Sequence, residues 1–220
     1  MAAGWRVEVL KDGIGDRVGA RPVGQRSVVV YDVARPVLVL GSSQRDDVVD
    51  WRRAEQRGVE VVRRRSGGSA VLVEPGAAVW VDVTIPPADP LWEHDVGRAF
   101  HWLGAVWTEV LSSAGIGCRW YDGPMRKPPW SAWVCFAGLG PGEVTIDGRK
   151  AVGLSQRRTR EGVLFQCCAA RRWEPERLLD LLALDDDERA RAAAELVGVA
   201  TGVGPDIDLV AGLVDALGTR

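Results

Sequence analysis

Lysine and histidine are scarce in this sequence of 220 residues, which has 25 arginines but only three lysines and two histidines. Its four cysteines form no CxxC pair, so a zinc site is not expected. No run of about 18 apolar residues is present, and the opening MAAGWRVEVLKDG lacks the apolar segment of a signal peptide. We therefore expect a cytoplasmic protein with free thiols, no metal site and no membrane partner.

An excess of charge of one sign is also missing. The net charge is -2 and the sequence pI is about 5.8, which gives no general attraction to nucleic acid or anionic membranes. Apolar residues make up 46% and charged residues 26% of the chain, as in ordinary globular proteins. A basic function must therefore be local, and the two basic clusters lie at 63–65 and 157–160.

Patterns typical of β-strands occupy the first three quarters of the chain. Short β-branched runs predict strands at 35–43, 59–62 and 78–86. Residues 50–58 predict a short helix capped by Asp50. The longest helix is predicted to begin at Asp89-Pro90, with the aspartate as N-cap, and to end at Gly115.

Helical patterns follow residue 174, in three successive segments. Roughly 45 residues are too few for an independent core. We therefore expect residues 1–220 to form a single domain of mixed α/β type, with the helical segment from about residue 175 packed on the sheet.

The stretch RRRSGGSAV, residues 63–71, joins a basic cluster to a two-glycine turn. Glycines let the backbone approach a ligand and point successive N–H groups at a phosphate or carboxylate. The glycine spacing fits neither a Walker A loop nor a Rossmann fingerprint. Spacing alone leaves two interpretations open: an anion-binding loop, or a tight turn beside a solvated basic patch.

The stretch EVTIDGRKAVGLSQ, residues 143–156, predicts a β-hairpin because Asp-Gly between two β-type runs favours a type I′ turn. Thr145 would then pair with Lys150, and Lys150 would share a face with Val152 and Leu154. A lysine among apolar neighbours needs a partner, either Glu143 permanently or the oxygen of a bound acyl or phosphate group. A compact ammonium can follow a carbonyl oxygen through a reaction better than a flat guanidinium can.

Cys135 lies in an aromatic- and glycine-rich loop, WSAWVCFAGLGPGE, just before this hairpin. A thiol near a lysine and several arginines can act as a nucleophile. The alternative is a buried thiol that packs against Trp133 and Phe136. Both interpretations stay open from the residues alone.

The remaining cysteines and the histidines give no functional pattern. Cys167 and Cys168 are adjacent in a predicted strand, so their side chains should point to opposite faces, and we interpret them as structural. His94 and His101 are seven residues apart on the predicted longest helix, without a partner spaced for a metal. We interpret them as surface or packing residues.

Three of these stretches together resemble the lipoate–protein ligase A family, within the biotin/lipoate ligase and lipoyl/octanoyl transferase superfamily. PVLVLGSSQRDDVVD resembles the early strand and turn of the family. VEVVRRRSGGSAVLVEPG resembles its Arg-Arg-x-Ser/Thr-Gly-Gly-Gly-Ala-Val loop, and EVTIDGRKAVGLSQRR its lysine strand, Gly-(Arg/Lys)-Lys-(Ile/Val)-x-Gly-x-Ala-Gln. The resemblance implies an α/β (α+β) fold with a mixed, largely antiparallel central sheet flanked by helices.

The resemblance also implies a site. In the family the sheet and the glycine loop hold the acyl chain, and the lysine contacts the acyl carbonyl or the adenylate phosphate. Lys150 would then be catalytic, and the pocket for the acyl group or acyl-AMP would be lined by Arg64, Ser66, Gly67, Gly68, Ser69, Ala70, Gly153 and Gln156. The sequence departs from the family pattern where Ser69 replaces the third glycine, Ser155 replaces the alanine before the glutamine, and LVEPGAA replaces the segment after the loop.

The function we predict first is attachment of lipoate or octanoate to a lysine of a lipoyl carrier domain by the ligase route, in which ATP and Mg²⁺ form an acyl-adenylate. The first alternative is an ATP-independent octanoyl or lipoyl transferase. In cysteine-dependent octanoyltransferases of the family a Cys-Phe pair precedes the lysine strand, as Cys135-Phe136 does here, and the cysteine carries octanoate taken from acyl carrier protein. The second alternative is a non-catalytic relative that binds an acylated partner. An accessory ligase subunit is a further partner that the ligase route implies.

Overall fold

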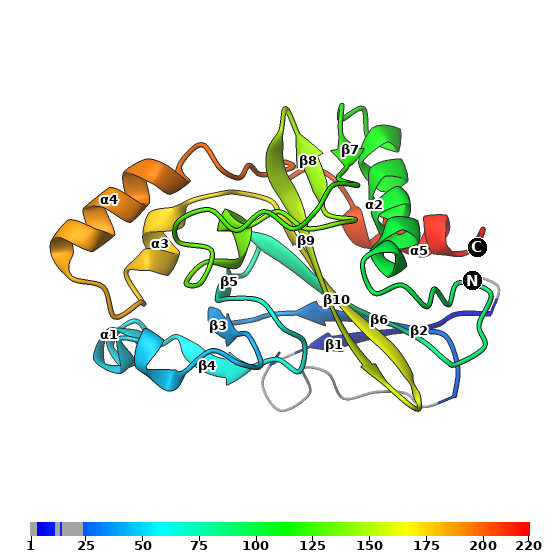
Figure 1. Cartoon of the computed structure of the whole chain (residues 1–220), viewed down its shortest axis with the longest axis horizontal. Helices are drawn as coiled ribbons and strands as arrows, with labels where there is room; N and C mark the ends of the chain where they lie inside the picture. Colours follow the sequence, from blue (N-terminus) through cyan, green and yellow to red (C-terminus); the bar gives the residue numbers. More distant parts are fainter. Residues whose placement is uncertain (1–3, 12–13, 15–23) are drawn as a thin grey trace.

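A seven-stranded sheet crosses the computed structural model, which describes residues 4–11, 14 and 24–220 (Figure 1). In spatial order its strands are β1 (Arg6–Lys11), β2 (Ser27–Asp32), β6 (Ala78–Ile85), β10 (Gly162–Ala170), β9 (Arg149–Thr159), β8 (Val144–Ile146) and β7 (Arg119–Trp120). β1 and β2 are parallel, and every other neighbouring pair is antiparallel. The predicted mixed, largely antiparallel sheet is therefore confirmed. Of the opening stretch that suggested no signal peptide, residues 1–3, 12 and 13 lie outside the described residues.

A smaller sheet contains β4 (Glu60–Arg63), β3 (Val37–Leu40) and β5 (Val71–Val73) in that order. β3 is parallel to β4 and antiparallel to β5. Beside this sheet lie a 3-10 turn, η1 (Asp46–Val48), and helix α1 (Trp51–Gln56), whose N-cap Asp50 accepts a hydrogen bond from the Arg53 N–H at 3.0 Å. The strands predicted at 35–43 and 59–62 and the helix predicted at 50–58 are thus confirmed.

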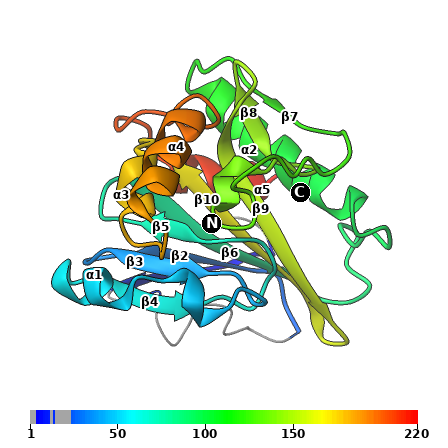
Figure 2. The ribbon, with the colours of Figure 1, turned by 60° about the vertical axis from the view of Figure 1, so that its left-hand side comes forward.

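Two apolar cores lie on the two faces of the large sheet (Figures 1 and 2). One face carries α2 (His101–Ser113) and α5 (Leu209–Leu217), and its core contains Trp107, Leu213 and the alternating residues 79, 81, 83 and 85 of β6. The other carries the smaller sheet with α3 (Pro175–Leu179) and α4 (Asp186–Leu196), and Trp80 of β6 faces it. β6 is buried on both sides because both faces are covered: one side is wholly apolar, and the other carries Asp82 and Thr84 beside Trp80.

The longest helix begins later than the sequence predicted. The Asp89 carboxylate accepts two hydrogen bonds from the Arg26 guanidinium, at 2.8 and 2.9 Å, and one from the Leu91 N–H, which closes a turn rather than a helix. The helical segment begins with a 3-10 turn, η2 (Arg98–Phe100), where the Asp95 side chain accepts from the Arg98 N–H at 2.8 Å. The predicted start at Asp89-Pro90 is therefore wrong, as is the placement of His94 on the helix. No helix in the described residues is long and apolar enough to span a membrane.

The predicted hairpin at Asp147-Gly148 is confirmed, with both turn residues at positive φ and Thr145 paired with Lys150. The next pair is Val144 with Val152, so β9 contains one extra residue at Ala151, a β-bulge. The bulge turns Lys150 away from the face that carries Val152. The prediction that Lys150 shares a face with Val152 and Leu154 is therefore wrong, because those two side chains lie in the other core.

Candidate active site

A cavity of about 670 Å³ lies between β9 and two loops, which we name the glycine loop (residues 63–70) and the cysteine loop (residues 130–143). Six of the predicted site residues line it: Gly67, Gly68, Ser69, Cys135, Lys150 and Gln156. The other four, Arg64, Ser66, Ala70 and Gly153, do not line it. The structure thus brings residues from sequence positions 67 to 156 around one space of the size that small-molecule sites have.

Cys135 begins the short 3-10 helix η3 (Cys135–Ala137), and its side chain borders the cavity. Two backbone hydrogen bonds hold it against the glycine loop: the Ala70 N–H donates to Trp133 O at 3.1 Å, and the Cys135 N–H donates to Ala70 O at 3.0 Å. As a result Cys135 Sγ lies 3.8 Å from Arg64 Nη2. The thiol therefore sits between a cation and an open cavity.

Arg64 is only 2% exposed and holds the glycine loop from beneath. Its guanidinium donates to the Gly67 carbonyl at 2.9 and 3.2 Å and to the Val39 carbonyl at 3.4 Å. None of these partners in the described part of the chain is a carboxylate, so the positive charge is available to an anion at Cys135 Sγ. Gly68 has a φ of 100°, and a Cβ there would lie 2.5 Å from Arg64 Nη2, so a larger residue cannot occupy this position.

Lys150 is 3% exposed and uses all three of its N–H groups within the chain. Nζ lies 2.7 Å from Glu143 Oε1, 3.0 Å from the Cys135 carbonyl oxygen and 3.1 Å from the Gly138 carbonyl oxygen. Of the two partners considered for Lys150, the structure contains Glu143. A rotatable ammonium can reach three separate oxygens in this way, whereas the donors of a guanidinium lie in one plane. This geometry gives a reason for a lysine in an arginine-rich chain.

Glu143 also binds two backbone N–H groups in addition to Lys150. Its Oε1 also accepts the Leu154 N–H at 3.1 Å, and its Oε2 accepts the Gly140 N–H at 2.7 Å. Both the carboxylate and the ammonium are buried, so each compensates the desolvated charge of the other. The pair therefore anchors the cysteine loop to β9.

Side-chain hydrogen bonds also join the cysteine loop to the glycine loop and to the turn after β3. Ser69, which stands where the family pattern has a glycine, donates to the Ser131 carbonyl. Gln44 donates to the Ala132 carbonyl at 3.0 Å, and its Oε1 accepts the Gly41 N–H at 3.1 Å. A Cβ on Gly41 would lie 1.7 Å from the Gly68 oxygen, so the turn and the glycine loop are in direct backbone contact.

Gln156 borders the cavity but directs its amide elsewhere. Its Nε2 donates to the Val96 carbonyl at 2.7 Å, and nearby Arg158 donates to the carbonyls of Glu93 and His94 at 2.7 and 3.2 Å. These bonds fix the segment before α2 as one rim of the cavity. The amide of Gln156 thus holds a wall in place in this structure.

The remaining cysteines are packing residues. Cys167 and Cys168 are buried in different cores, which confirms that they point to opposite faces. Burial is the main cause that raises the pKa of both thiols. For Cys168 the nearby Cys135 adds to the increase, Arg64 and Lys150 act against it, and the resulting pKa is about 12. No group of three or more histidine, cysteine, aspartate or glutamate side chains in the described residues is arranged to hold a metal.

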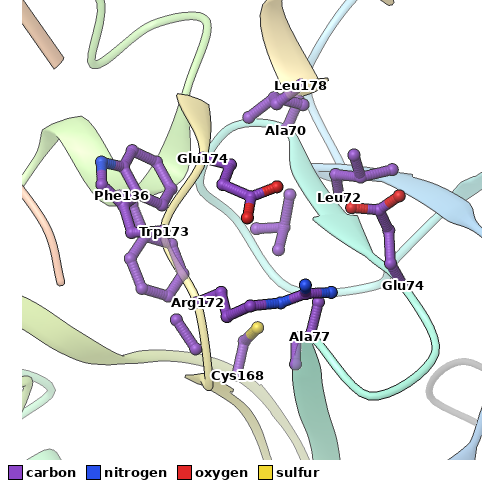
Figure 3. A pocket seen from close by; sticks show the side chains of 13 residues that line it. Ala70, Leu72, Glu74, Ala77, Phe136, Cys168, Arg172, Trp173, Glu174 and Leu178 are labelled. Atoms are coloured by element: carbon purple, nitrogen blue, oxygen red, sulfur yellow. The ribbon is translucent and has the colours of Figure 1, made fainter. Parts of the chain in front are cut away.

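A second, smaller hollow of about 50 Å³ lies behind the same two loops (Figure 3). Ala70 and Phe136 line it, one residue after Ser69 and Cys135 of the larger cavity. The Phe136 ring stacks on Trp173 at 5.4 Å between centroids, and Lys150 Nζ lies 5.1 Å from the Phe136 ring centroid. Phe136 therefore lies between the larger cavity and this hollow.

Several contributors to the site were missed by reading the sequence. They include Gln44, Phe136 as a dividing ring, and a buried polar chain through Asp82 and Gln166. A signal for the last two existed: Asp82 is the one charged residue of the strand AVWVDVTI, and Gln166 is the one amide in the strand GVLFQCCAA. Buried polar groups require partners, so both residues indicate a hydrogen-bonded chain inside the sheet.

The chain belongs to the lipoyl protein ligase A/B catalytic domain family, because the sequence model of that family matches residues 20–203. The resemblance drawn from the three motifs is thereby confirmed.

Two curated relatives bear the name octanoyltransferase LipM. The protein of Carboxydothermus hydrogenoformans is 29% identical over 167 residues, which cover 74% of this chain and 61% of the relative. That of Kyrpidia tusciae is 27% identical over 209 residues, which cover 87% of this chain and 75% of the relative. The chain thus spans less than two thirds of the length of the first of these relatives.

Solved structures show the same fold at lower identity. A bipartite lipoate protein ligase of Thermoplasma acidophilum, determined with its E2 lipoyl domain, has a TM-score of 0.73 at 16% identity and matches 97% of this chain and 80% of that chain. A lipoate-protein ligase A bound with ATP has a TM-score of 0.67 at 15% identity over 97% and 82% of the two chains. The predicted fold of the lipoate ligase catalytic domain is confirmed by this likeness.

Proposed function

We propose that this chain transfers an octanoyl or lipoyl group to a lysine of a lipoyl carrier domain through a thioester on Cys135, without ATP. The observation that carries the proposal is the Cys135 thiol, which borders a cavity of about 670 Å³ and lies 3.8 Å from the Arg64 guanidinium. The names of the two curated relatives support the same route. The ligase route, placed first from the sequence, becomes the second candidate.

The reaction consists of two acyl exchanges at one sulfur. In the first, Cys135 sulfur bonds to the carbonyl carbon of an acyl thioester, such as octanoyl acyl carrier protein, and the donor thiol leaves with the proton. In the second, the ε-amine of the carrier lysine bonds to the same carbon, and the C–S bond to Cys135 breaks. The products are an amide and the free Cys135 thiol, so neither step needs a nucleotide.

Arg64 and the glycine loop supply the electrostatic part of the proposal. The guanidinium stabilises negative charge on Sγ when the thiolate attacks and when it leaves. Gly67, Gly68 and Ser69 of the glycine loop border the cavity, as Cys135 does, and their backbone N–H groups are our candidates for the donors that bind the oxyanion of the tetrahedral intermediate.

Lys150 acts chiefly as a positioning residue in this proposal. It binds the Cys135 carbonyl oxygen, and its charge is compensated by Glu143 at 2.7 Å. To polarise a substrate carbonyl, as the family resemblance implies, it must exchange one of its three present partners. An adenylate phosphate would likewise have to compete with Glu143, which weighs against the ligase route.

The proposal includes the partners and the extent of the domain. The acceptor is a lipoyl carrier domain, and the acyl donor is a carrier protein thioester. We further propose that the chain acts as one domain, a view supported by the contribution of α3 and α4 to one core and of α5 to the other.

The ATP-dependent ligase remains the second candidate because of the size and charge of the cavity. About 670 Å³ exceeds the need of an eight-carbon acyl chain, and the rim carries Arg45, Arg126 and Lys127, which suit a phosphate. In that case ATP and Mg²⁺ would be required, and Cys135 would not. An accessory subunit would then be a further partner.

The test is acylation of an apo lipoyl domain, followed by its intact mass. Wild type, Cys135→Ser and the matched control Cys118→Ser are each incubated with octanoyl acyl carrier protein without ATP, or with lipoate, ATP and Mg²⁺. We expect acylation without ATP that disappears in Cys135→Ser and persists in Cys118→Ser. Acylation that requires ATP and survives in Cys135→Ser would establish the ligase instead, and no acylation in either mixture would contradict both routes.

A further inference from the structure

A chain of buried polar side chains runs from the centre of the large sheet to the wall of the cavity. It connects Asp82 on β6, Gln166 on β10, Ser66 in the glycine loop and Ser155 on β9. The first three are each at most 2% exposed, whereas Ser155 borders the cavity. The links are short: Gln166 Nε2 to Asp82 Oδ1 at 3.0 Å, Ser66 Oγ to Gln166 Oε1 at 2.7 Å, and Ser155 Oγ to Ser66 Oγ at 2.8 Å.

Asp82, at the buried end of the chain, determines which atom donates and which accepts in each of these hydrogen bonds. Asp82 is an acceptor, because its carboxylate also receives hydrogen bonds from the Trp80 indole Nε1–H at 3.0 Å and from the Tyr31 hydroxyl at 3.1 Å. The amide nitrogen of Gln166 must therefore face Asp82, which turns its carbonyl oxygen towards Ser66.

The orientation of Gln166 in turn fixes the donors and acceptors at Ser66 and Ser155. Gln166 Oε1 receives both the Ser66 N–H at 3.3 Å and the Ser66 hydroxyl proton. Having given its proton to Gln166, Ser66 can only accept from Ser155. The Ser155 proton goes inwards to Ser66 Oγ, or to the Gln166 backbone oxygen at 3.4 Å, and in both cases lone pairs of Ser155 face the cavity.

We infer that Ser155 Oγ is the hydrogen-bond acceptor for the N–H of the amine that attacks the Cys135 thioester. This inference rests on the proposed function and adds a residue to its second step. Acyl chains carry no hydrogen-bond donor, so an acceptor in this wall serves the amine rather than the acyl group. The Ser155 side chain lies on the same face of β9 as Gly153, two residues earlier. Lys150 Cε lies 3.1 Å from the Cβ position of Gly153, so Ser155 and the Lys150 ammonium face the same side of the strand.

Ser155 orients the amine and does not act as its base. Gln166 has no acidic proton to pass on, so the chain cannot transfer a proton to Asp82. During the second exchange the C–N bond forms while the C–S bond breaks, and the proton from nitrogen goes to the departing Cys135 sulfur. Asp82, Gln166 and Ser66 are positioning residues that keep the Ser155 lone pairs towards the cavity.

The position of Ser155 makes the proposal easy to test. The family pattern has alanine here, so Ser155→Ala introduces a residue that this fold accepts. Ser155→Thr keeps the hydroxyl, and Ser131→Ala removes a different hydroxyl at the same cavity. Ser66→Ala removes the oxygen that receives the Ser155 proton at 2.8 Å, so that proton can turn towards the cavity, while Gln166 Oε1 keeps the Ser66 N–H.

The two acyl exchanges are measured separately by quenched-flow mass spectrometry, as octanoyl-Cys135 formation and as its decay in the presence of apo lipoyl domain. We expect Ser155→Ala to form octanoyl-Cys135 at the wild-type rate and to transfer it about tenfold more slowly, the effect of one hydrogen bond. Ser155→Thr and Ser131→Ala should transfer normally. Ser66→Ala should show the same selective defect, with no further loss in the Ser66→Ala, Ser155→Ala double variant.

Three results would overturn the inference: transfer by Ser155→Ala at the wild-type rate, equal slowing of both exchanges, or additive losses in the double variant. If Ser66→Ala fails to fold, the comparison of Ser155→Ala with Ser155→Thr decides alone. Failure of the proposed function is distinguishable, because wild type would then form no octanoyl-Cys135 at all.

Discussion

The two walls of the cavity are built differently. The wall on β9 is part of a ladder of backbone hydrogen bonds with β10 and β8, so the positions of Lys150 and Ser155 are fixed by strand pairing. The opposite wall consists of the glycine and cysteine loops, which meet at the single bridge between Ala70 and Val134 and depend on side chains such as Lys150, Gln44 and Ser69. The nucleophile proposed here lies on the loop wall. The sheet therefore acts as a scaffold that holds a reactive loop through a few buried polar contacts.

The largest effect should come from the loop wall. Cys135→Ala should reduce transfer on the order of 10⁴-fold or more, as removal of a nucleophile does, and change thermal unfolding little. Steady-state transfer and a melting curve measure this. The matched control Cys118→Ala should keep its activity, and substantial transfer by Cys135→Ala would place the chemistry elsewhere.

Cys135 on the loop wall should be more reactive than Cys167 and Cys168, which are buried in the large sheet. At pH 8 only about one Cys168 thiol in 10⁴ is ionised if its pKa is about 12, and Cys167 is likewise buried. Iodoacetamide followed by peptide mapping should label Cys135 in the native protein, and label Cys167 and Cys168 only after denaturation. Rapid labelling of Cys168 in the native state would show that the sheet opens more readily than its burial indicates.

The contact that joins the walls should matter for both stability and activity. Lys150→Met leaves the buried Glu143 carboxylate without its cation, which should cost about 3–5 kcal/mol of unfolding free energy. Lys150→Met with Glu143→Leu removes both charges but leaves the Leu154 and Gly140 N–H groups without their acceptor, so we expect it to recover part of the stability and none of the activity. Chemical denaturation and transfer rates separate the two effects, and recovery of both would contradict a role for Lys150 in positioning Cys135.

Substitution of Phe136 should have an effect of intermediate size on acyl-chain selectivity and stability. Phe136→Leu should open the larger cavity towards the hollow next to Trp173, destabilise the fold by about 1–2 kcal/mol and increase the share of acyl groups longer than octanoyl among the products. Competition between acyl donors of different length measures this. An unchanged product distribution would mean that the acyl chain ends away from Phe136.

The smallest effect concerns the segment before α2. Burial raises the pKa of Asp89, but the Arg26 guanidinium and the Leu91 N–H outweigh it, so that the pKa lies below its usual range. A carboxyl group with a lowered pKa stabilises the fold above its unfolded pKa near 3.8 and loses this contribution as the pH falls through the folded pKa. Asp89→Asn should therefore be about 1 kcal/mol less stable than wild type at pH 7, with a difference that shrinks in acid. A difference independent of pH would mean that the loss comes from packing.

Local signals in the sequence predicted the elements that local physics determines. The Asp147-Gly148 hairpin, the Asp50 cap and the alternating valines of β6 were correct because turn chemistry, capping and burial act over a few residues. Asp89 misled because its cap signal is satisfied by Arg26, 63 residues away, and the bulge at Ala151 that redirects Lys150 has no marker in the sequence. Tertiary partners decide such positions.

The site was predictable where a residue type names its own chemistry. Cys135, Lys150 and the glycine loop fall in that class, and so does Glu143 as the partner of a buried lysine. The walls around them were not, because Gln44, Phe136 and the chain from Asp82 to Ser155 gain their roles only when distant strands are placed side by side. Asp82 and Gln166 were nevertheless visible as a charged residue and an amide in strands that are otherwise largely apolar.

The most direct test is to trap the acyl group on the wild-type protein. After mixing with octanoyl acyl carrier protein, without ATP and without a lipoyl domain, the intact mass should rise by one octanoyl group. Peptide mapping should place that group on Cys135, hydroxylamine should remove it, and addition of apo lipoyl domain should discharge it into an amide. A wild-type protein that stays unmodified, while the lipoyl domain is acylated only with ATP, would contradict the account.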